Sequence, residues 1–387
     1  MNNSTSILRF NSALFTRPSA VLAFLAAWLL LATLPAHAAI RVWLNPVSGG
    51  WSEATNWSGG AVPVSSDDAY ITNNGTFTVT NDAGASFATL TLGGVGGTQS
   101  LNWSSGSLSG STTIGTNGAV NLVGAGTKSL YGVITNYGQV VWTSGGGAWY
   151  WYGNSGARLE NQPGGLLDVQ LDGSFMLASG TPVINNAGTF RKSGGSGTLT
   201  MNSAFVFGNQ GTLQAQIGTI QLPNLYSETP SANLAVSLGG TTPGTQYGHI
   251  HFPSAPTFSG KFTVTPSNGF TPSPGNTFYV LSYPSASGNF IAMDGLDFGN
   301  GLRLEPHFAK TGLTLTTVNV PTSAELTLSI YLLPSSLLVS WPIEFTGYQL
   351  YSTTNLATPV WTLMSIAGIN NTVVPIIPQQ YFRLSNP

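Results

Sequence analysis

The chain contains no cysteine and very few charged residues, and each shortage excludes a class of structure or function. Among its 387 residues, Asp, Glu, Lys and Arg together make up 6%, against about 25% in typical soluble domains. Without cysteine the chain can form no disulfide, no thiolate metal site, no cysteine nucleophile and no lipid-modified cysteine. Burial and hydrogen bonding must therefore stabilise the fold.

Basic residues are too scarce to form a nucleic-acid-binding surface. The whole chain has a formal net charge of −2. Without the N-terminal segment that carries Arg9 and Arg17, 9 basic and 13 acidic residues remain, a net charge of −4. Such a chain has nothing with which to neutralise a phosphate backbone. The sequence therefore predicts no nucleic-acid partner.

The first 38 residues have the organisation of a secretory signal peptide. Arg9 and Arg17 are followed by an apolar stretch at 20–34 and by the small-x-small site Ala36-His37-Ala38. The apolar stretch is shorter than the roughly 20 residues of a membrane-spanning helix. We expect a cleaved signal peptide at residues 1–38, no integral membrane segment after its removal, and a protein that is secreted or held at the cell surface.

Glycine and alternating apolar residues are what the sequence has in abundance. Gly occupies 48 positions and 42% of residues are hydrophobic, with a low net charge, which does not fit a disordered chain. Apolar residues fall two apart, as at Phe77 and Val79, so they lie on one face of a short strand. Glycine-rich turns separate these strands. The sequence predicts an all-β fold.

An Asn-x-Gly turn returns at a regular interval and predicts a solenoid. Asn186-Ala187-Gly188 and Asn209-Gln210-Gly211 are each followed by Thr and an apolar residue, so the same unit recurs after 23 residues. A hairpin meander is the alternative, but it places turns every 8–12 residues. The longer period favours a parallel β-helix with three strands per coil. Stacked coils would bring equivalent Asn side chains about 4.8 Å apart, close enough for an amide ladder, with Phe and Leu stacked inside.

Three tryptophans, Trp43, Trp51 and Trp57, stand close together near the start of the mature chain. We interpret them as a cap over the open end of the solenoid, with a sugar-binding platform as the alternative. The motif G-W-x4-N-W-S-G-G-x2-P begins at Gly50, and Asp67-Asp68 follow it. It resembles the entry segment of bacterial autotransporter-type and related secreted β-helix proteins. Over roughly residues 40–225, that resemblance implies a right-handed parallel β-helix.

The repeat weakens after residue 225, and two further parts are predicted. Ser340-Trp341-Pro342 and the terminal Tyr381-Phe382-Arg383-Leu384 resemble the small fibronectin type III-like module at the C-terminus of many bacterial secreted proteins. Trp341 and Trp361 are expected in its core. The predicted organisation is a signal peptide at 1–38, a Trp-rich cap at 39–69, a right-handed parallel β-helix at 70–225, a β-rich capping region at 226–320 and a small β-sandwich-like module at 321–387.

No group of residues predicts catalysis, and we expect no metal and no cofactor. His249 and His251 share one face of a strand and could hold Zn²⁺ only if a third ligand approached. Asp168 and Asp172 share one face of a regular strand and could serve polysaccharide hydrolysis or Ca²⁺ binding. The basic pair Arg191-Lys192 is interpreted as a solvated turn.

The run Trp149-Tyr150-Trp151-Tyr152 places its Trp and Tyr residues on opposite faces of a strand. Packing between coils is the favoured interpretation, and an outward platform for sugar rings is the alternative. Trp149 and Trp151, with Asp168 and Asp172, then form the candidate carbohydrate site. We expect a secreted, non-enzymatic structural or adhesin-like surface protein; the alternative is a carbohydrate-binding or polysaccharide-degrading one. The partners indicated are cell-surface or extracellular polysaccharide, or surface proteins.

Overall fold

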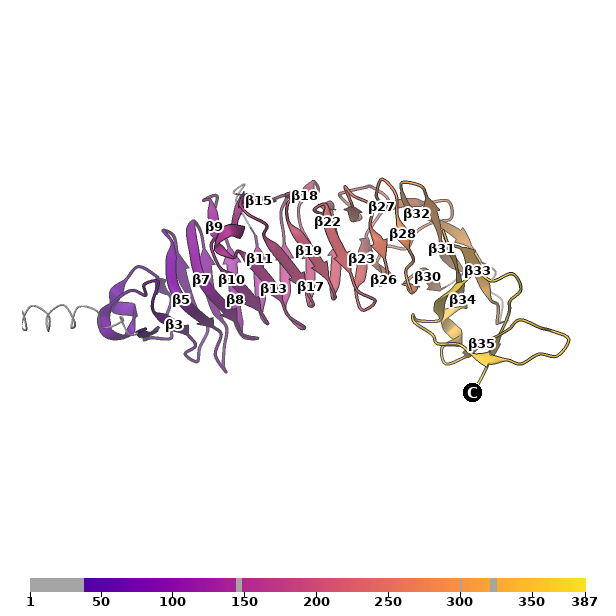
Figure 1. Ribbon diagram of the computed structural model, residues 1–387, viewed down its shortest axis with the longest axis horizontal. Helices are drawn as coiled ribbons and strands as arrows, with labels where there is room; N and C mark the ends of the chain where they lie inside the picture. The colour runs from indigo at the N-terminus through magenta and orange to yellow at the C-terminus, as the bar shows by residue number, and fades with distance from the viewer. Residues whose placement is uncertain (1–37, 144–147, 300, 321–325) are drawn as a thin grey trace, which may run out of the picture. The chain divides into compact units, whose positions relative to one another are not determined.

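The computed structural model describes residues 38–143, 148–299, 301–320 and 326–387, and residues 40–387 form one compact unit. The predicted signal peptide lies, except for Ala38, outside the described residues. Strands follow one another as successive coils from β3 (Asp68–Ile71) to β27 (Thr277–Ser282) (Figure 1). The predicted all-β fold and parallel β-solenoid are confirmed. No helix among the described residues is long and apolar enough to cross a membrane.

An eleven-stranded sheet and a nineteen-stranded sheet make up the solenoid. Each coil contributes one strand to the eleven-stranded sheet and up to two strands to the nineteen-stranded sheet. The eleven-stranded sheet is parallel throughout and contains β2 (Gly49–Gly50), β4 (Phe77–Asn81), β6 (Gln99–Trp103), β8 (Gly118–Leu122), β11 (Gln139–Trp142), β14 (Leu166–Val169), β17 (Thr189–Lys192), β20 (Thr212–Ala215), β23 (Asn233–Leu238), β26 (Lys261–Pro266) and β29 (Ala292–Asp294). The nineteen-stranded sheet contains β1 (Ile40–Val42), β3, β5 (Ala85–Leu92), β7 (Gly106–Ile114), β9 (Lys128–Leu130), β10 (Val133–Asn136), β12 (Trp149–Tyr152), β13 (Arg158–Asn161), β15 (Ser174–Ser179), β16 (Val183–Asn186), β18 (Thr198–Met201), β19 (Val206–Asn209), β21 (Thr219–Gln221), β22 (Leu225–Glu228), β24 (His249–His251), β27, β30 (Asp297–Gly299), β31 (Leu302–Ala309) and β32 (Gly312–Asn319).

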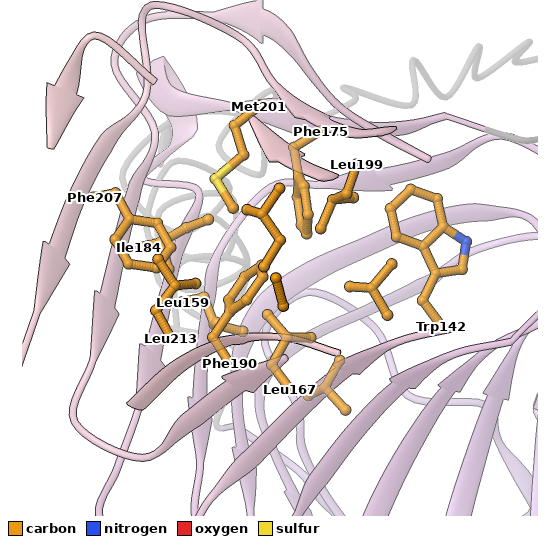
Figure 2. Close-up of a cluster of buried hydrophobic side chains, with 14 of the residues drawn as sticks. Trp142, Leu159, Leu167, Phe175, Ile184, Phe190, Leu199, Met201, Phe207 and Leu213 are labelled. Carbon is orange, nitrogen blue, oxygen red and sulfur yellow. The ribbon is translucent and has the colours of Figure 1, made fainter. Parts of the chain in front are cut away.

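Alternation along each strand decides which side chains fill the interior. Leu167, Phe190 and Leu213 occupy equivalent positions on β14, β17 and β20. All three are completely buried and stack along the solenoid axis (Figure 2). Full burial of one such side chain contributes about 1.5–3 kcal/mol. The predicted internal stack of Phe and Leu is confirmed.

A ladder of buried asparagines runs along the solenoid at the turn that leads into the eleven-stranded sheet. The side-chain nitrogen of Asn136 donates to the oxygen of Asn161 at 2.8 Å, Asn161 donates to Asn186 at 2.7 Å, and Asn186 donates to Asn209 at 2.9 Å. Each nitrogen of the first three also donates to a strand carbonyl, those of Leu166, Thr189 and Thr212. The predicted Asn ladder is confirmed.

The glycine of each Asn-x-Gly turn is required by the stacking itself. A Cβ atom added at Gly188 or at Gly211 would collide with the backbone carbonyl oxygen of the equivalent glycine one coil earlier. Any side chain there would force the coils apart. The repeated glycine therefore follows from close backbone approach between coils.

A tyrosine and a glutamate end the ladder. Asn209 Nδ2 lies 3.5 Å from the hydroxyl of Tyr226, which donates to Glu228 at 2.7 Å. The same carboxylate accepts the backbone N–H groups of Ser259 and Gly260. Burial first, and then the Glu228 charge, raise the pKa of Tyr226 well above its ordinary value.

The three N-terminal tryptophans are buried. Trp43, Trp51 and Trp57 are at most 2% exposed. The ring centroids of Trp43 and Trp51 lie 5.2 and 4.8 Å from that of Trp57 in edge-to-face contacts, and Trp51 reaches Phe87 of the first coils at 5.7 Å. These contacts bury the three rings at the N-terminal end of the solenoid. The short 3-10 turn η1 (Ala54–Asn56) lies between Trp51 and Trp57, and η2 (Ser58–Gly60) follows Trp57.

The parallel ladder extends beyond the predicted range of 70–225 at both ends. β1 already pairs in parallel with β3, and β23, β26 and β29 continue the parallel pairing of the eleven-stranded sheet to Asp294. Residues 239–248 and later loops lengthen these coils, so the 23-residue period is lost although the stacking continues. The antiparallel strands β30 to β32 then close the end of the solenoid, with β32 paired to β27.

Two small antiparallel sheets form the C-terminal region. One contains β33 (Ser329–Leu332), β34 (Ser336–Ser340) and β37 (Asn371–Pro375), and the other contains β36 (Thr362–Leu363), β35 (Gln349–Thr353) and β38 (Tyr381–Ser385). Trp341 is buried in the core between them. Trp361 is half-buried beneath the guanidinium of Arg383, which lies 4.5 Å from the centroid of the Trp361 ring.

Asn371 joins this region to the solenoid by accepting the backbone N–H of Met293 and donating to Asp294. The remaining short elements are β25 (Thr257–Phe258), β28 (Ser287–Gly288), η3 (Gly153–Ser155) and η4 (Ile343–Phe345).

The asparagine ladder predicts a large effect for a small substitution. Asn186→Ala leaves a donor of Asn161 and an acceptor of Asn209 buried without partners, so we expect a loss of about 1–3 kcal/mol in the free energy of unfolding. Urea unfolding followed by tryptophan fluorescence measures it. Asn154→Ala, at an exposed position, is the control and should change stability by less than about 0.5 kcal/mol. Equal midpoints for both variants would contradict a stabilising ladder.

Candidate functional site

A polar groove lies on the outer face of the eleven-stranded sheet, where β20, β23 and β26 end. Leu213 and Ala215 of β20 point inward, so Gln214 between them faces outward. Gln214 pairs in register with Ala235, and Ser237 two residues later pairs with Thr265. The long connection at 239–248 builds one wall of the groove. The register of three stacked strands therefore places these polar side chains side by side.

The groove has a volume of about 540 Å³. Uncharged polar side chains dominate its lining, which consists of Ser193, Gln214, Gln216, Ile217, Ser237, Gly239, Thr245, Gln246, Thr265, Pro266, Ser267 and Asn268. Among the residues that the structure describes, no ionisable side chain lines it. The groove can therefore offer hydrogen bonds to a neutral polar ligand but no general acid or base.

Side chains within the groove already form a partial hydrogen-bond network. Gln216 donates to the side-chain oxygen of Gln214 at 3.3 Å, and Gln214 donates to Ser237 at 3.4 Å. On the opposite wall the side-chain oxygen of Gln246 accepts the backbone N–H of Thr242 at 3.0 Å. These contacts orient the amides, and the half-buried Gln214 and Gln216 and the exposed Gln246 keep further donors and acceptors for a ligand.

Asp168 lies beside one end of this groove but is fully engaged. Its carboxylate accepts hydrogen bonds from Arg191 at 2.9 Å, Gln170 at 2.9 Å and Ser193 at 2.6 Å, and the residue is 1% exposed. Burial raises the pKa of Asp168, but the hydrogen bonds and the charge of Arg191 outweigh it, so the pKa lies below its ordinary value. Asp168 orients Ser193 at the groove and is not free to act as a catalytic acid.

Asp172 takes part in a different interaction, which corrects our interpretation of Arg191-Lys192. Lys192 is on β17, its side chain is completely buried, and its ammonium donates to Asp172 at 2.8 Å. It also donates to the carbonyls of Leu171, Gly194 and Gly195. Arg191-Lys192 is therefore not a solvated turn. Arg191 points outward to Asp168 and Lys192 points inward to a turn, because neighbouring strand residues face opposite sides.

The predicted carbohydrate site is not assembled as the sequence suggested. Trp149 and Trp151 have no exposed area and pack against the ring of Phe175, with centroids 5.3 and 5.8 Å away. The favoured interpretation, packing between coils, holds, since the strand turns its two Trp residues inward, and these rings cannot form a surface platform. The same alternation turns Tyr152 outward, where its ring stacks on Tyr131 with centroids 4.0 Å apart and planes at 17°. A side-chain hydrogen bond with Tyr152 is the largest cause that raises the pKa of Tyr131.

The groove residues could not be predicted from the sequence, because nothing in their local sequence marks them. Gln214, Gln216 and Gln246 look like ordinary polar residues, and only the stacking of coils more than twenty residues apart brings them together. The alternation of Trp149 to Tyr152 indicated that Tyr152 faces away from the two Trp residues, but its partner Tyr131 comes from another coil and could not be identified from that pattern. Asp168, which was a candidate, proves to be a neighbour that positions Ser193.

Neither comparisons with known proteins nor side-chain clusters add a further assignment. No family model and no curated protein matches this chain. Within the described ranges, no group of three or more His, Cys, Asp or Glu side chains is placed to hold a metal ion. The chemistry of the site therefore has to be argued from its own residues.

The lowered pKa of Asp168 predicts a specific loss of stability in acid. The unfolded chain binds a proton at Asp168 more readily than the folded chain does. The Asp168 carboxylate therefore contributes fully to folding stability above its ordinary pKa of 3.8, and this contribution is lost as the pH falls below that value. Thermal midpoints measured between pH 2 and 7 should fall less steeply for Asp168→Asn than for the wild type. Asp82→Asn, at an exposed carboxylate, should retain the wild-type slope, and parallel curves for all three proteins would contradict the role of Asp168.

Lys192 predicts a second stability effect, located in the turn that it supports. Lys192→Met keeps an apolar stem but removes four hydrogen bonds from a buried ammonium, so we expect a loss of about 1.5–3 kcal/mol. Amide hydrogen exchange should increase at Ser193 to Gly197. Lys310→Met, at an exposed lysine, is the matched control, and unchanged exchange in this turn would refute the assignment.

Proposed function

We propose that this protein is an exported, non-enzymatic, adhesin-like surface protein that works through the lateral face of its β-solenoid. One observation carries the proposal: the polar groove is lined by amides and hydroxyls without an ionisable side chain. Binding needs such groups, whereas hydrolysis of a glycosidic bond needs a pair of carboxyl groups.

The hydrogen bonds that already engage the two candidate acids support a binding function over a catalytic one. Asp168 is saturated by three hydrogen bonds, and Asp172 is bound to Lys192 and to the backbone of Gly197. Neither carboxylate lines the groove. A general acid would need a raised pKa and access to the substrate, and the pKa of Asp168 is lowered.

Carbohydrate binding is the second candidate, and the lining of the groove favours it as the ligand chemistry. A neutral polysaccharide carries no charge and presents a dense array of hydroxyl groups. Gln214, Gln216 and Gln246 provide both donors and acceptors for such a ligand, and Ile217 and Pro266 provide apolar contact for the C–H face of a sugar ring. The half-buried Tyr131–Tyr152 stack on the other large sheet offers aromatic surface of the same kind.

A glycan array and a reducing-end assay, applied to the chain from Ala39 onwards, test both candidates. We expect binding to one class of polysaccharide without release of reducing ends. Gln214→Ala combined with Gln246→Ala should weaken this binding by about tenfold or more, equivalent to about 1.4 kcal/mol. Gln139→Ala changes an exposed glutamine on the same sheet, outside the groove, and should bind as the wild type does.

The outcomes separate the two candidates. Binding that survives the double substitution would locate the ligand elsewhere, and release of reducing ends would replace a binding function with a degrading one. Absence of any glycan binding would remove carbohydrate as the ligand and leave the adhesin-like role to a protein partner. Retention of the protein in the cytoplasm on cell fractionation would refute the exported role altogether.

A further inference from the structure

Two histidines and a serine converge on the outer face of the nineteen-stranded sheet, away from the polar groove. His249 and His251 lie two residues apart on β24, on either side of the buried Ile250. β24 pairs in parallel with β27, where His251 stands opposite Ser282. Both histidines are half-buried. The third polar group, Ser282, comes from the next coil, and the sequence alone could not place it beside the histidines.

The serine hydroxyl lies between the two imidazoles. Ser282 Oγ is 2.8 Å from Nε2 of His249 and 2.7 Å from Nδ1 of His251. Two ring nitrogens from neighbouring strand positions are therefore directed at a single point. Zn²⁺–nitrogen bonds are about 2.0–2.1 Å long, so each ring would have to move by about 0.7 Å to bind an ion at that point.

The protonation of His249 is fixed by its other nitrogen. Nδ1 of His249 lies 3.0 Å from the backbone carbonyl oxygen of Tyr279, and a carbonyl can only accept a hydrogen bond. Nδ1 therefore carries the proton, and Nε2 directs its lone pair at Ser282. Histidines that bind metals characteristically donate their other N–H to a carbonyl or carboxylate in this way.

We propose that His249, His251 and Ser282 form a binding site for one divalent transition-metal ion of the copper, nickel or zinc type. The two imidazoles are the first two ligands, the Ser282 hydroxyl rotates off the point at which they converge and becomes the third, and water fills the remaining positions. Imidazole ligands favour these ions over Ca²⁺ and Mg²⁺, and Cu²⁺ binds most tightly in the general order of affinities.

The surroundings of the pair support this assignment. The strand residues opposite the histidines on β21 are the uncharged Thr219 and Gln221, and the ring of Tyr279 lies 5.2 Å from that of His249. An ion here would join β24 to β27 and so fasten one coil to the next, near the point where β32 closes the solenoid.

Copper titration of the chain from Ala39 onwards tests the proposal. Isothermal titration calorimetry should give one Cu²⁺ ion bound through this site, and electron paramagnetic resonance should show coupling to two imidazole nitrogens. His249→Gln and His251→Gln should each weaken binding by about tenfold or more, equivalent to about 1.4 kcal/mol. His307→Gln, which removes the other histidine of the mature chain, an exposed one, should leave binding unchanged.

The two measurements keep the proposal falsifiable even if a variant folds poorly. The resonance spectrum is recorded on the wild-type protein and needs no substitution, and a spectrum without imidazole nitrogen would overturn the proposal. So would a folded His249→Gln protein that binds copper as the wild type does, because the ion would then be held elsewhere, for example by the terminal amine. Glycan binding that persists after metal removal with a chelator is expected, because the groove and the histidine pair are separate.

Discussion

The in-register stacking of equivalent Asn-containing turns is the constraint on which the rest of this structure depends. The amide of Asn161 can reach both Asn136 and Asn186 only if every coil repeats the position of the coil before it. A slip of one residue would turn each asparagine to the other face of its strand. The same register stacks Phe190 on Leu167 inside and places Gln214 beside Arg191 outside. Core, ladder and lateral groove are therefore consequences of one alignment.

The parts of the structure that repeat locally could be predicted from the sequence, and those that depend on contacts between distant residues could not. The Asn-x-Gly turns recur at a regular spacing in the sequence, so both the coils and the asparagine ladder could be predicted from them. Lys192 was misinterpreted because the neighbouring glycines indicate a turn, whereas its side chain enters the interior to reach the carbonyls of those glycines. The extension past residue 225 was hidden because inserted loops changed the period. Ser282 could not be joined to His251 without the pairing of β24 with β27.

Several of the few charged side chains in this protein are buried and hold turns or junctions together. Lys128 is completely buried and its ammonium donates to the carbonyls of Gly124 and Gly126, in the same manner as Lys192. Arg303, 3% exposed, donates to Ser329 and Tyr331 and so joins the end of the solenoid to the C-terminal sheets. These charges hold turns and junctions, and none of them lines the lateral groove. Its chemistry is that of amides and hydroxyls.

The direction of the asparagine ladder has an electrical consequence. Every rung donates toward the C-terminal coils, from Asn136 through Asn209 to the hydroxyl of Tyr226, so the amide dipoles add head to tail as peptide dipoles do in a helix. Chains of hydrogen bonds polarise one another. The donor end carries the partial positive charge, and there the tyrosine hydroxyl donates in turn to the carboxylate of Glu228. A chain with few charged residues thus contains a buried row of aligned amide dipoles, and the negative charge of Glu228 lies at its positive end.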